Sequence, residues 1–199
     1  MVKFVGEVMT ETRKMYVLLM RSNSLPSVLI RFLTRSSYTH ASLGFSADCM
    51  QLYSFARKYE NLPLPGCFVC EKIDRGFMGK NPKVPCALYS FDVPVETFEN
   101  VRGEVMGMYR QKEGYKYNYL GLILCGIGIA KRRKNKYFCS EFVAHTLKKN
   151  GALEISKPSS LFRPTDFPKL PQLKLLYEGN IGGLRNKILI NSNQQRGLL

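Results

Sequence analysis

Alternating and continuous apolar positions dominate the first half of the chain and predict β-strands. Segments rich in Val, Ile, Leu, Tyr and Phe are separated by turns and polar loops. They cover residues 15–21, 38–45, 50–55, 66–73 and 87–93. Ser46, Ala47 and Asp48 lie between the second and third of these segments, so we expect a hairpin there. The pattern predicts a small, mainly antiparallel sheet.

From residue 95 the apolar period changes from that of a strand to that of a helix. Val95, Phe98, Val101, Val105 and Met108 recur at helical spacing, which predicts an amphipathic helix over 95–111. Further helices are expected over 24–33, 119–129 and 139–150, with loops over 57–65, 74–82 and 131–136 and short strands over 173–177 and 187–190.

These elements indicate one α+β domain in which helices pack against the sheet. A chain of 199 residues is long enough for one buried core and short for two. We expect the domain to cover residues 1–190. The polar segment 191–199 is expected to be a mobile tail.

Two short blocks carry the candidate chemistry. The first, at residues 38–45, reads YTHASLGF and predicts a strand with His40 near its start. The second, at residues 137–143, reads YFCSEFV and predicts a helix that begins at Cys139. A helix N-terminus stabilises a thiolate, and an imidazole can take the proton of the thiol. Cys139 and His40 are therefore the candidate nucleophile and base, with a buried structural cysteine and a structural histidine as the alternatives.

Other polar residues are candidates for supporting roles. His145 lies six residues after Cys139 on the same predicted helix and points away from it, which leaves His40 as the base. A third group should orient the imidazole. The neighbouring strand offers Gln51, Tyr53 and Ser54, and the strand register decides among them. Glu141 is expected to cap the helix or to hold the basic loop.

The order of these blocks resembles a known group of enzymes. A histidine strand followed by the block Phe-Cys-Ser-Glu-Phe-Val is similar to the permuted papain-like amidases of the NlpC/P60 superfamily, which include YiiX-like and lecithin:retinol-acyltransferase-like proteins. Residues 52–58, Pro65-Gly66 with Glu71, and Pro164-Thr165-Asp166 add weaker similarity. The resemblance implies a single-domain, circularly permuted papain-like fold. It also implies a cysteine peptidase, amidase, acyltransferase or thioesterase with Cys139 as nucleophile and His40 as base.

We therefore expect a cysteine-dependent hydrolase or acyl-transfer enzyme that cleaves an amide or ester through an acyl-enzyme. The substrate would be peptide-like, a cell-wall fragment or a lipid acyl group, and neither a metal nor a cofactor is expected. Cys67 and Cys70 have the spacing of a metal or redox pair, but the sequence offers no second close pair and no histidine beside them.

The net charge of +15 suggests anionic partners, and five of the six residues from 131 to 136 are basic. An anionic membrane or cell-wall surface is one candidate, whereas nucleic acid is disfavoured because no binding motif is present. The alternative function is a non-catalytic basic module that binds such surfaces or nucleic acid. No signal peptide or transmembrane helix is evident, so a reducing, cytoplasmic location with peripheral membrane association is expected.

Overall fold

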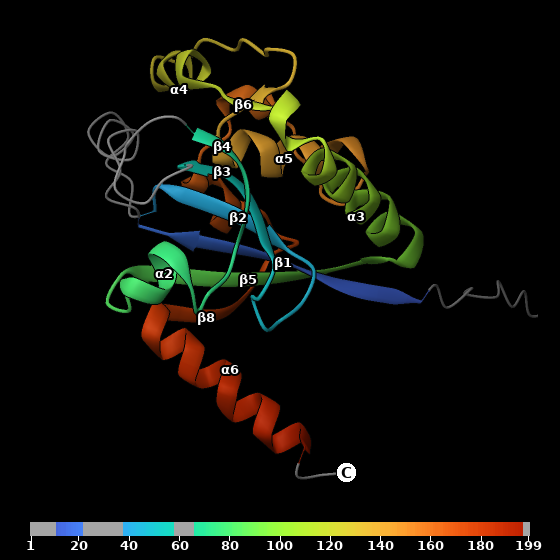
Figure 1. The fold of residues 1–199 in the computed structure, drawn as a ribbon. Coiled ribbons are helices and arrows are strands. Elements are labelled where there is room, and N and C mark those ends of the chain that lie inside the picture. Colours follow the sequence, from blue (N-terminus) through green and yellow to red (C-terminus); the bar gives the residue numbers. More distant parts are fainter. Residues whose placement is uncertain (1–10, 22–37, 58–65, 197–199) are drawn as a thin grey trace, which may run out of the picture.

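The computed structural model describes residues 11–21, 38–57 and 66–196, and only the backbone of residues 57, 195 and 196. Its centre is an open eight-stranded sheet with the order β7-β6-β4-β3-β2-β1-β5-β8 (Figure 1). All neighbouring strands are antiparallel except β6 and β7. The strands are β1 (Thr12–Met20), β2 (His40–Gly44), β3 (Leu52–Arg57), β4 (Gly66–Glu71), β5 (Pro85–Pro94), β6 (Lys116–Tyr117), β7 (Lys136–Tyr137) and β8 (Lys174–Asn180).

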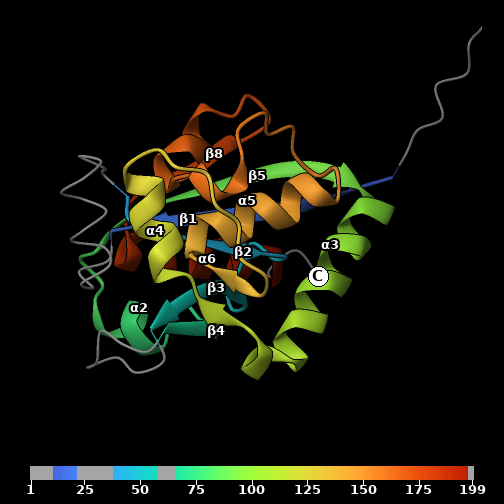
Figure 2. The same cartoon turned by 90° about the horizontal axis from the view of Figure 1, so that it is seen from above.

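Helices cover both faces of the sheet. The helices α3 and α5 lie on one face, and α2 and α6 lie on the other (Figures 1 and 2). The α-helices are α2 (Gly76–Lys80), α3 (Val95–Arg110), α4 (Tyr119–Gly126), α5 (Cys139–Lys149) and α6 (Ile181–Arg196). Three short 3₁₀ helices complete the described part: η1 (Lys112–Gly114), η2 (Ser159–Leu161) and η3 (Pro164–Lys169).

Strand β1 is a continuous apolar run because it is covered on both faces of the sheet. Its alternate residues Val17 and Leu19 pack into the cluster beneath α3 and α5, whereas Leu18 and Met20 pack into the cluster with α2 and α6. Successive side chains of a strand point to opposite faces, so a strand covered on both sides is apolar at every position. This central strand, paired with β2 and β5, fixes the position of the start of β2.

The α+β class and the antiparallel character of the sheet agree with the sequence analysis, but several details differ. Residues 187–190 belong to helix α6 rather than to a strand, and the helix continues to Arg196. The expected loop at 74–82 contains the short helix α2. The expected helix over 24–33 and most of the loop over 57–65 lie outside the described residues.

The difference at α6 has a physical cause. The side chains of α6 beyond Leu184 are mostly exposed, so no apolar period marks the helix in the sequence. Within the described ranges, no helix is long and apolar enough to cross a bilayer.

Candidate active site

Cys139 is the first residue of α5 and lies in the interior. The preceding residue, Phe138, has an extended backbone (φ −96°, ψ 168°), and its amide donates to Oε2 of Glu141 at 3.3 Å. The Cys139 thiol donates to the backbone carbonyl of Thr39 (Sγ···O 3.9 Å). This contact ties the start of α5 to the residue that precedes β2, and only 2% of Cys139 is exposed.

His40 is the first residue of β2 and lies beside both a thiol and a carboxylate. Its Nε2 is 2.9 Å from Oε2 of Glu71, the last residue of β4. The hydroxyl of Ser42 donates to the same carboxylate oxygen at 2.7 Å and lies 3.2 Å from His40 Nε2. The His40 ring also interacts with the Cys139 thiol. The structure therefore brings together Cys139, His40 and Glu71.

The surroundings of His40 favour its charged form. Burial of the ring opposes a positive charge, but the charge of Glu71 and the hydrogen bonds with Cys139 and Glu71 outweigh it. Together they raise the pKa of His40 from 6.5 to about 10. A positively charged imidazole beside the sulfur favours the thiolate form of a cysteine.

The structure places the three expected third residues away from the imidazole. The hydroxyl of Tyr53 contacts Oε1 of Gln51 at 3.3 Å and the sulfur of Met106 at 3.6 Å. The hydroxyl of Ser54 donates to the Ala41 carbonyl at 2.7 Å and so connects β3 to β2. The polar group within hydrogen-bonding distance of His40 Nε2 that comes from the neighbouring strands is instead Glu71 of β4.

The carboxylate beside the imidazole comes from β4, one strand further along the sheet than β3. Glu71 pairs with Leu52 across β3 and β4, and this register cannot be read from the sequence. One sequence signal does exist. Glu71 is the single charged residue in the strand GCFVCE, and an isolated acid at the end of an apolar strand has few structural reasons to be there.

A buried amide connects the starts of α4 and α5. The side chain of Asn118 donates to Oε2 of Glu141 at 3.1 Å and accepts from the amide of Gly121 at 3.0 Å, so it caps α4. Burial raises the pKa of Glu141, while the hydrogen bonds from Asn118 and the Phe138 amide oppose this shift. Gly121 leaves room for this cap, because a Cβ there would collide with the side-chain amide of Asn118.

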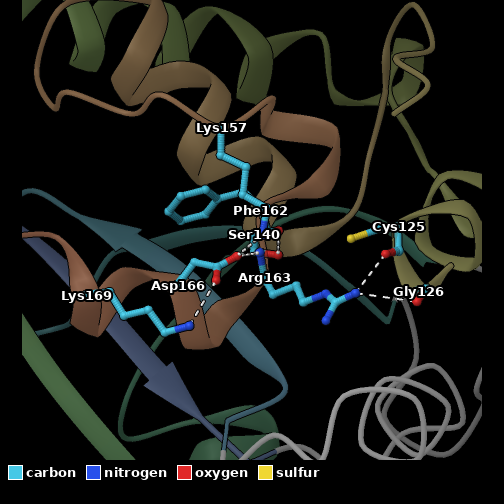
Figure 3. A network of polar contacts seen from close by, with 8 residues as sticks. All are labelled: Cys125, Gly126, Ser140, Lys157, Phe162, Arg163, Asp166 and Lys169. Carbon is cyan, nitrogen blue, oxygen red and sulfur yellow. Dashed lines mark hydrogen bonds and ion pairs between the residues drawn. The ribbon is translucent and has the colours of Figure 1, made fainter. Parts of the chain in front are cut away.

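A second polar network holds the far end of α4 (Figure 3). Arg163 donates to the carbonyls of Cys125 at 3.0 Å and Gly126 at 3.4 Å, which are C-terminal carbonyls of α4. The Arg163 amide donates to Asp166, which also pairs with Lys157 at 2.7 Å. Next to the candidate nucleophile, the hydroxyl of Ser140 donates to the Phe162 carbonyl at 2.7 Å. The segment after α5 thus connects α4 to the start of α5.

The half-buried Tyr117 lies close to Cys139 and packs on Tyr119, with ring centroids 4.6 Å apart. Burial raises the pKa of its hydroxyl, and the nearby Cys139 and Glu141 act in the same direction. The Tyr119 hydroxyl accepts a hydrogen bond from the Gly66 amide at 2.6 Å. A Cβ at Gly66 would lie 2.7 Å from the Tyr117 ring, so the start of β4 approaches this ring as only glycine can.

The second histidine, His145, has a different environment. Its ring stacks on Tyr137 at a centroid distance of 5.6 Å, and the Arg132 guanidinium donates to its Nε2 at 2.8 Å. Burial and the charge of Arg132 lower the pKa of His145. The ring lines a surface cavity of about 580 Å³ together with Arg132 and Lys149, separate from the contacts of Cys139.

The remaining cysteines lack these features. Burial raises the pKa values of Cys49 and Cys86 to about 12, and it also raises those of Cys70 and Cys125. All six cysteines are free. Cys67 and Cys70 are three residues apart on β4 and therefore project to opposite faces of the strand, which is unsuitable for a shared ion. No group of three metal-ligating side chains occurs within the described part of the chain.

No protein-family model matches the chain, and the search of curated proteins gave no significant match.

Proposed function

We propose that the protein is a cysteine-dependent hydrolase or acyl-transfer enzyme that acts on an amide or ester bond. Cys139 is the nucleophile, His40 is the general base and acid, and Glu71 orients the imidazole. The observation that carries the proposal is the position of His40, whose ring interacts with the Cys139 thiol and lies 2.9 Å from the Glu71 carboxylate. A nucleophile, a base and an orienting group in this order form a catalytic triad.

Each group has a defined step in the proposed reaction. Glu71 holds Nε2 of His40, which leaves Nδ1 to exchange a proton with the Cys139 sulfur. The thiolate attacks the carbonyl carbon, and the backbone N–H groups of the first turn of α5 stabilise the oxyanion. The imidazolium then gives its proton to the leaving amine or alcohol as the carbon–heteroatom bond breaks. His40 next deprotonates a water or another acceptor, which attacks the thioester and releases Cys139.

The chain order supports a permuted papain-like fold for this site. The histidine lies on a strand that precedes the cysteine helix, and the cysteine begins a helix packed against an antiparallel sheet. The substrate classes consistent with the chemistry are a peptide-like amide and a lipid acyl ester. The free state of all six cysteines supports a reducing, cytoplasmic setting.

The proposal is tested by the reactivity of the individual thiols. We expect iodoacetamide near neutral pH to label Cys139 faster than the other five cysteines, as measured by mass spectrometry. Replacement of His40 by Ala should slow this labelling about a hundredfold, because it removes the imidazolium that stabilises the Cys139 thiolate. His145→Ala is the matched control and should leave the rate unchanged. Cys139 is almost fully buried, and its burial slows labelling in every variant. The test is therefore the ratio of Cys139 labelling rates between variants.

A reactive ester provides the catalytic test. Incubation with p-nitrophenyl acetate should place one acetyl group on Cys139, and this group should persist longer in His40→Ala, where the deacylating base is missing. Earlier labelling of another cysteine, together with no acetylation of Cys139, would favour the non-catalytic basic module instead.

A further inference from the structure

Helix α4 and the residues that follow it expose aliphatic side chains beside the candidate active site. Leu120, Ile123, Ile127 and Ile129 are between 44% and 62% exposed, and they fall within ten consecutive residues. Soluble surfaces carry isolated exposed aliphatic residues, but a contiguous group marks an interaction site. We name these four residues the aliphatic ridge. Figure 1 shows α4 at the end of the molecule opposite α6.

The ridge is held on a fixed support. The inner residues of α4, Leu122 and Cys125, pack on Phe138, which directly precedes Cys139. Asn118 fixes the start of α4 through Glu141, and Arg163 fixes its end (Figure 3). The exposed aliphatic side chains are therefore presented by a helix that is anchored on both sides to the residues around the candidate nucleophile.

A strongly basic segment adjoins the ridge. Only Ala130 separates Ile129 from the basic residues Lys131, Arg132, Arg133, Lys134 and Lys136, and no acidic residue occurs between positions 114 and 140. Arg132 donates to His145, while Lys131 and Lys134 are exposed. An aliphatic ridge next to a cationic loop has the composition of an element that lies in a membrane interface.

We infer that the aliphatic ridge and the basic loop dock the protein on an anionic lipid surface, with α4 lying in the interface beside the Cys139 site. The inference deepens the proposed function, because it implies that the acyl substrate is held at a membrane. A polyanion would match the basic loop but would gain nothing from four exposed aliphatic side chains. A second copy of the chain would match the ridge, but its own +15 charge opposes close approach.

The aliphatic contribution is tested by co-sedimentation of the full chain with phosphatidylcholine vesicles that contain phosphatidylserine. We expect the double variant Ile123→Ser, Ile127→Ser to bind at least tenfold more weakly than the unmodified chain. The matched control is Leu189→Ser, Ile190→Ser on α6, where the side chains are equally exposed but distant. It should bind like the unmodified chain.

The charged contribution is tested with the same vesicles. Lys131→Gln, Arg133→Gln and Lys134→Gln together should weaken binding about a hundredfold at low salt, and less at high salt. The control triple variant Lys83→Gln, Arg110→Gln and Lys148→Gln removes three exposed charges elsewhere and should have a much smaller effect. Vesicles of phosphatidylcholine alone should bind weakly.

Three results would overturn the inference. In the first, the double variant Ile123→Ser, Ile127→Ser binds as tightly as the unmodified chain, whereas the triple charge variant binds weakly. This result would indicate that the basic loop binds a soluble polyanion. Sedimentation velocity could reveal a dimer that Ile127→Ser disrupts, which would assign the ridge to a second copy. The α6 control could lose as much binding as the ridge variant. Cys139→Ala should bind vesicles normally, so a failure of docking and a failure of the proposed catalysis are distinguishable.

Discussion

The two histidines of the chain show how surroundings divide one residue type into two roles. His40 lies between the Cys139 thiol and the Glu71 carboxylate, and its pKa is raised. His145 lies between the Tyr137 ring and the Arg132 guanidinium, and its pKa is lowered. Burial opposes the charged form of each ring, although His40 is buried and His145 is only partly buried. The sign of the neighbouring charge decides the difference.

The charged form of His40 and the neutral form of His145 suit different chemical roles. A histidine that carries a proton beside a sulfur can support a thiolate and later deliver that proton to a leaving group. A neutral histidine that accepts a hydrogen bond from an arginine instead fixes the arginine in place. In this protein the first lies on the central sheet, and the second lies on the outward side of α5, next to the basic loop.

The largest expected effect concerns the pH dependence of stability. The folded-state pKa of His40 lies above its ordinary value of 6.5, so its contribution is fully present below pH 6.5 and is lost as the pH rises toward about 10. The unmodified chain should therefore lose more free energy of unfolding than His40→Gln over this range. The expected difference is on the order of 3 kcal/mol, measured by urea denaturation.

His145→Gln is the control for this measurement. The lowered pKa of His145 means that its contribution is present above the ordinary value and is lost as the pH falls below it. Its stability profile above pH 7 should match that of the unmodified chain. Equal losses in the unmodified chain and in His40→Gln would show that His40 is not stabilised as the cation.

A smaller effect is expected when the partner carboxylate is removed. Glu71→Gln keeps the shape of the side chain but removes the charge that raises the pKa of His40. We expect the iodoacetamide rate of Cys139 near pH 6.5 to fall about tenfold, and the pH midpoint of labelling to move. Glu104→Gln, which removes the partner of Lys149 near His145, should leave both unchanged. If the pH dependence of Cys139 labelling were the same in Glu71→Gln and in the unmodified chain, Glu71 would contribute only to packing.

The smallest effect is expected at the second histidine. Arg132→Gln removes a charge that lowers the pKa of His145, so this pKa should rise. Proton NMR titration of the two imidazole C–H signals reports both rings in one experiment. The His40 signal should not move, and a parallel shift of both signals would show that the two environments are coupled.

The sequence predicted the parts of this molecule that depend on local pattern. The strand that begins at His40 and the helices that begin at Val95 and Cys139 follow from apolar period and from turn residues. The proximity of Cys139 and His40 was expected from their chemistry, because a thiol at a helix start and an imidazole on a strand are complementary.

The features that the sequence did not predict depend on strand register and on contacts between residues far apart in the chain. Glu71 reaches His40 because β4 follows β3 in the sheet, and the length and path of the intervening segment set that register. Asn118 is a turn residue in the sequence, and its contact with Glu141 needs the packing of α4 beside α5. The strands β6 and β7 have two residues each, which is too short to give a period.

The buried Asn118 has a consequence for the way this region opens. Its side chain is hydrogen-bonded to both helix starts, to Gly121 in α4 and to Glu141 in α5. If α4 unfolded alone, the carboxylate of Glu141 would remain in the interior without its amide partner, at a cost of about 1–3 kcal/mol. The two helices should therefore exchange their first-turn amide hydrogens as one cooperative unit, with a shared opening free energy, rather than as two independently fraying segments.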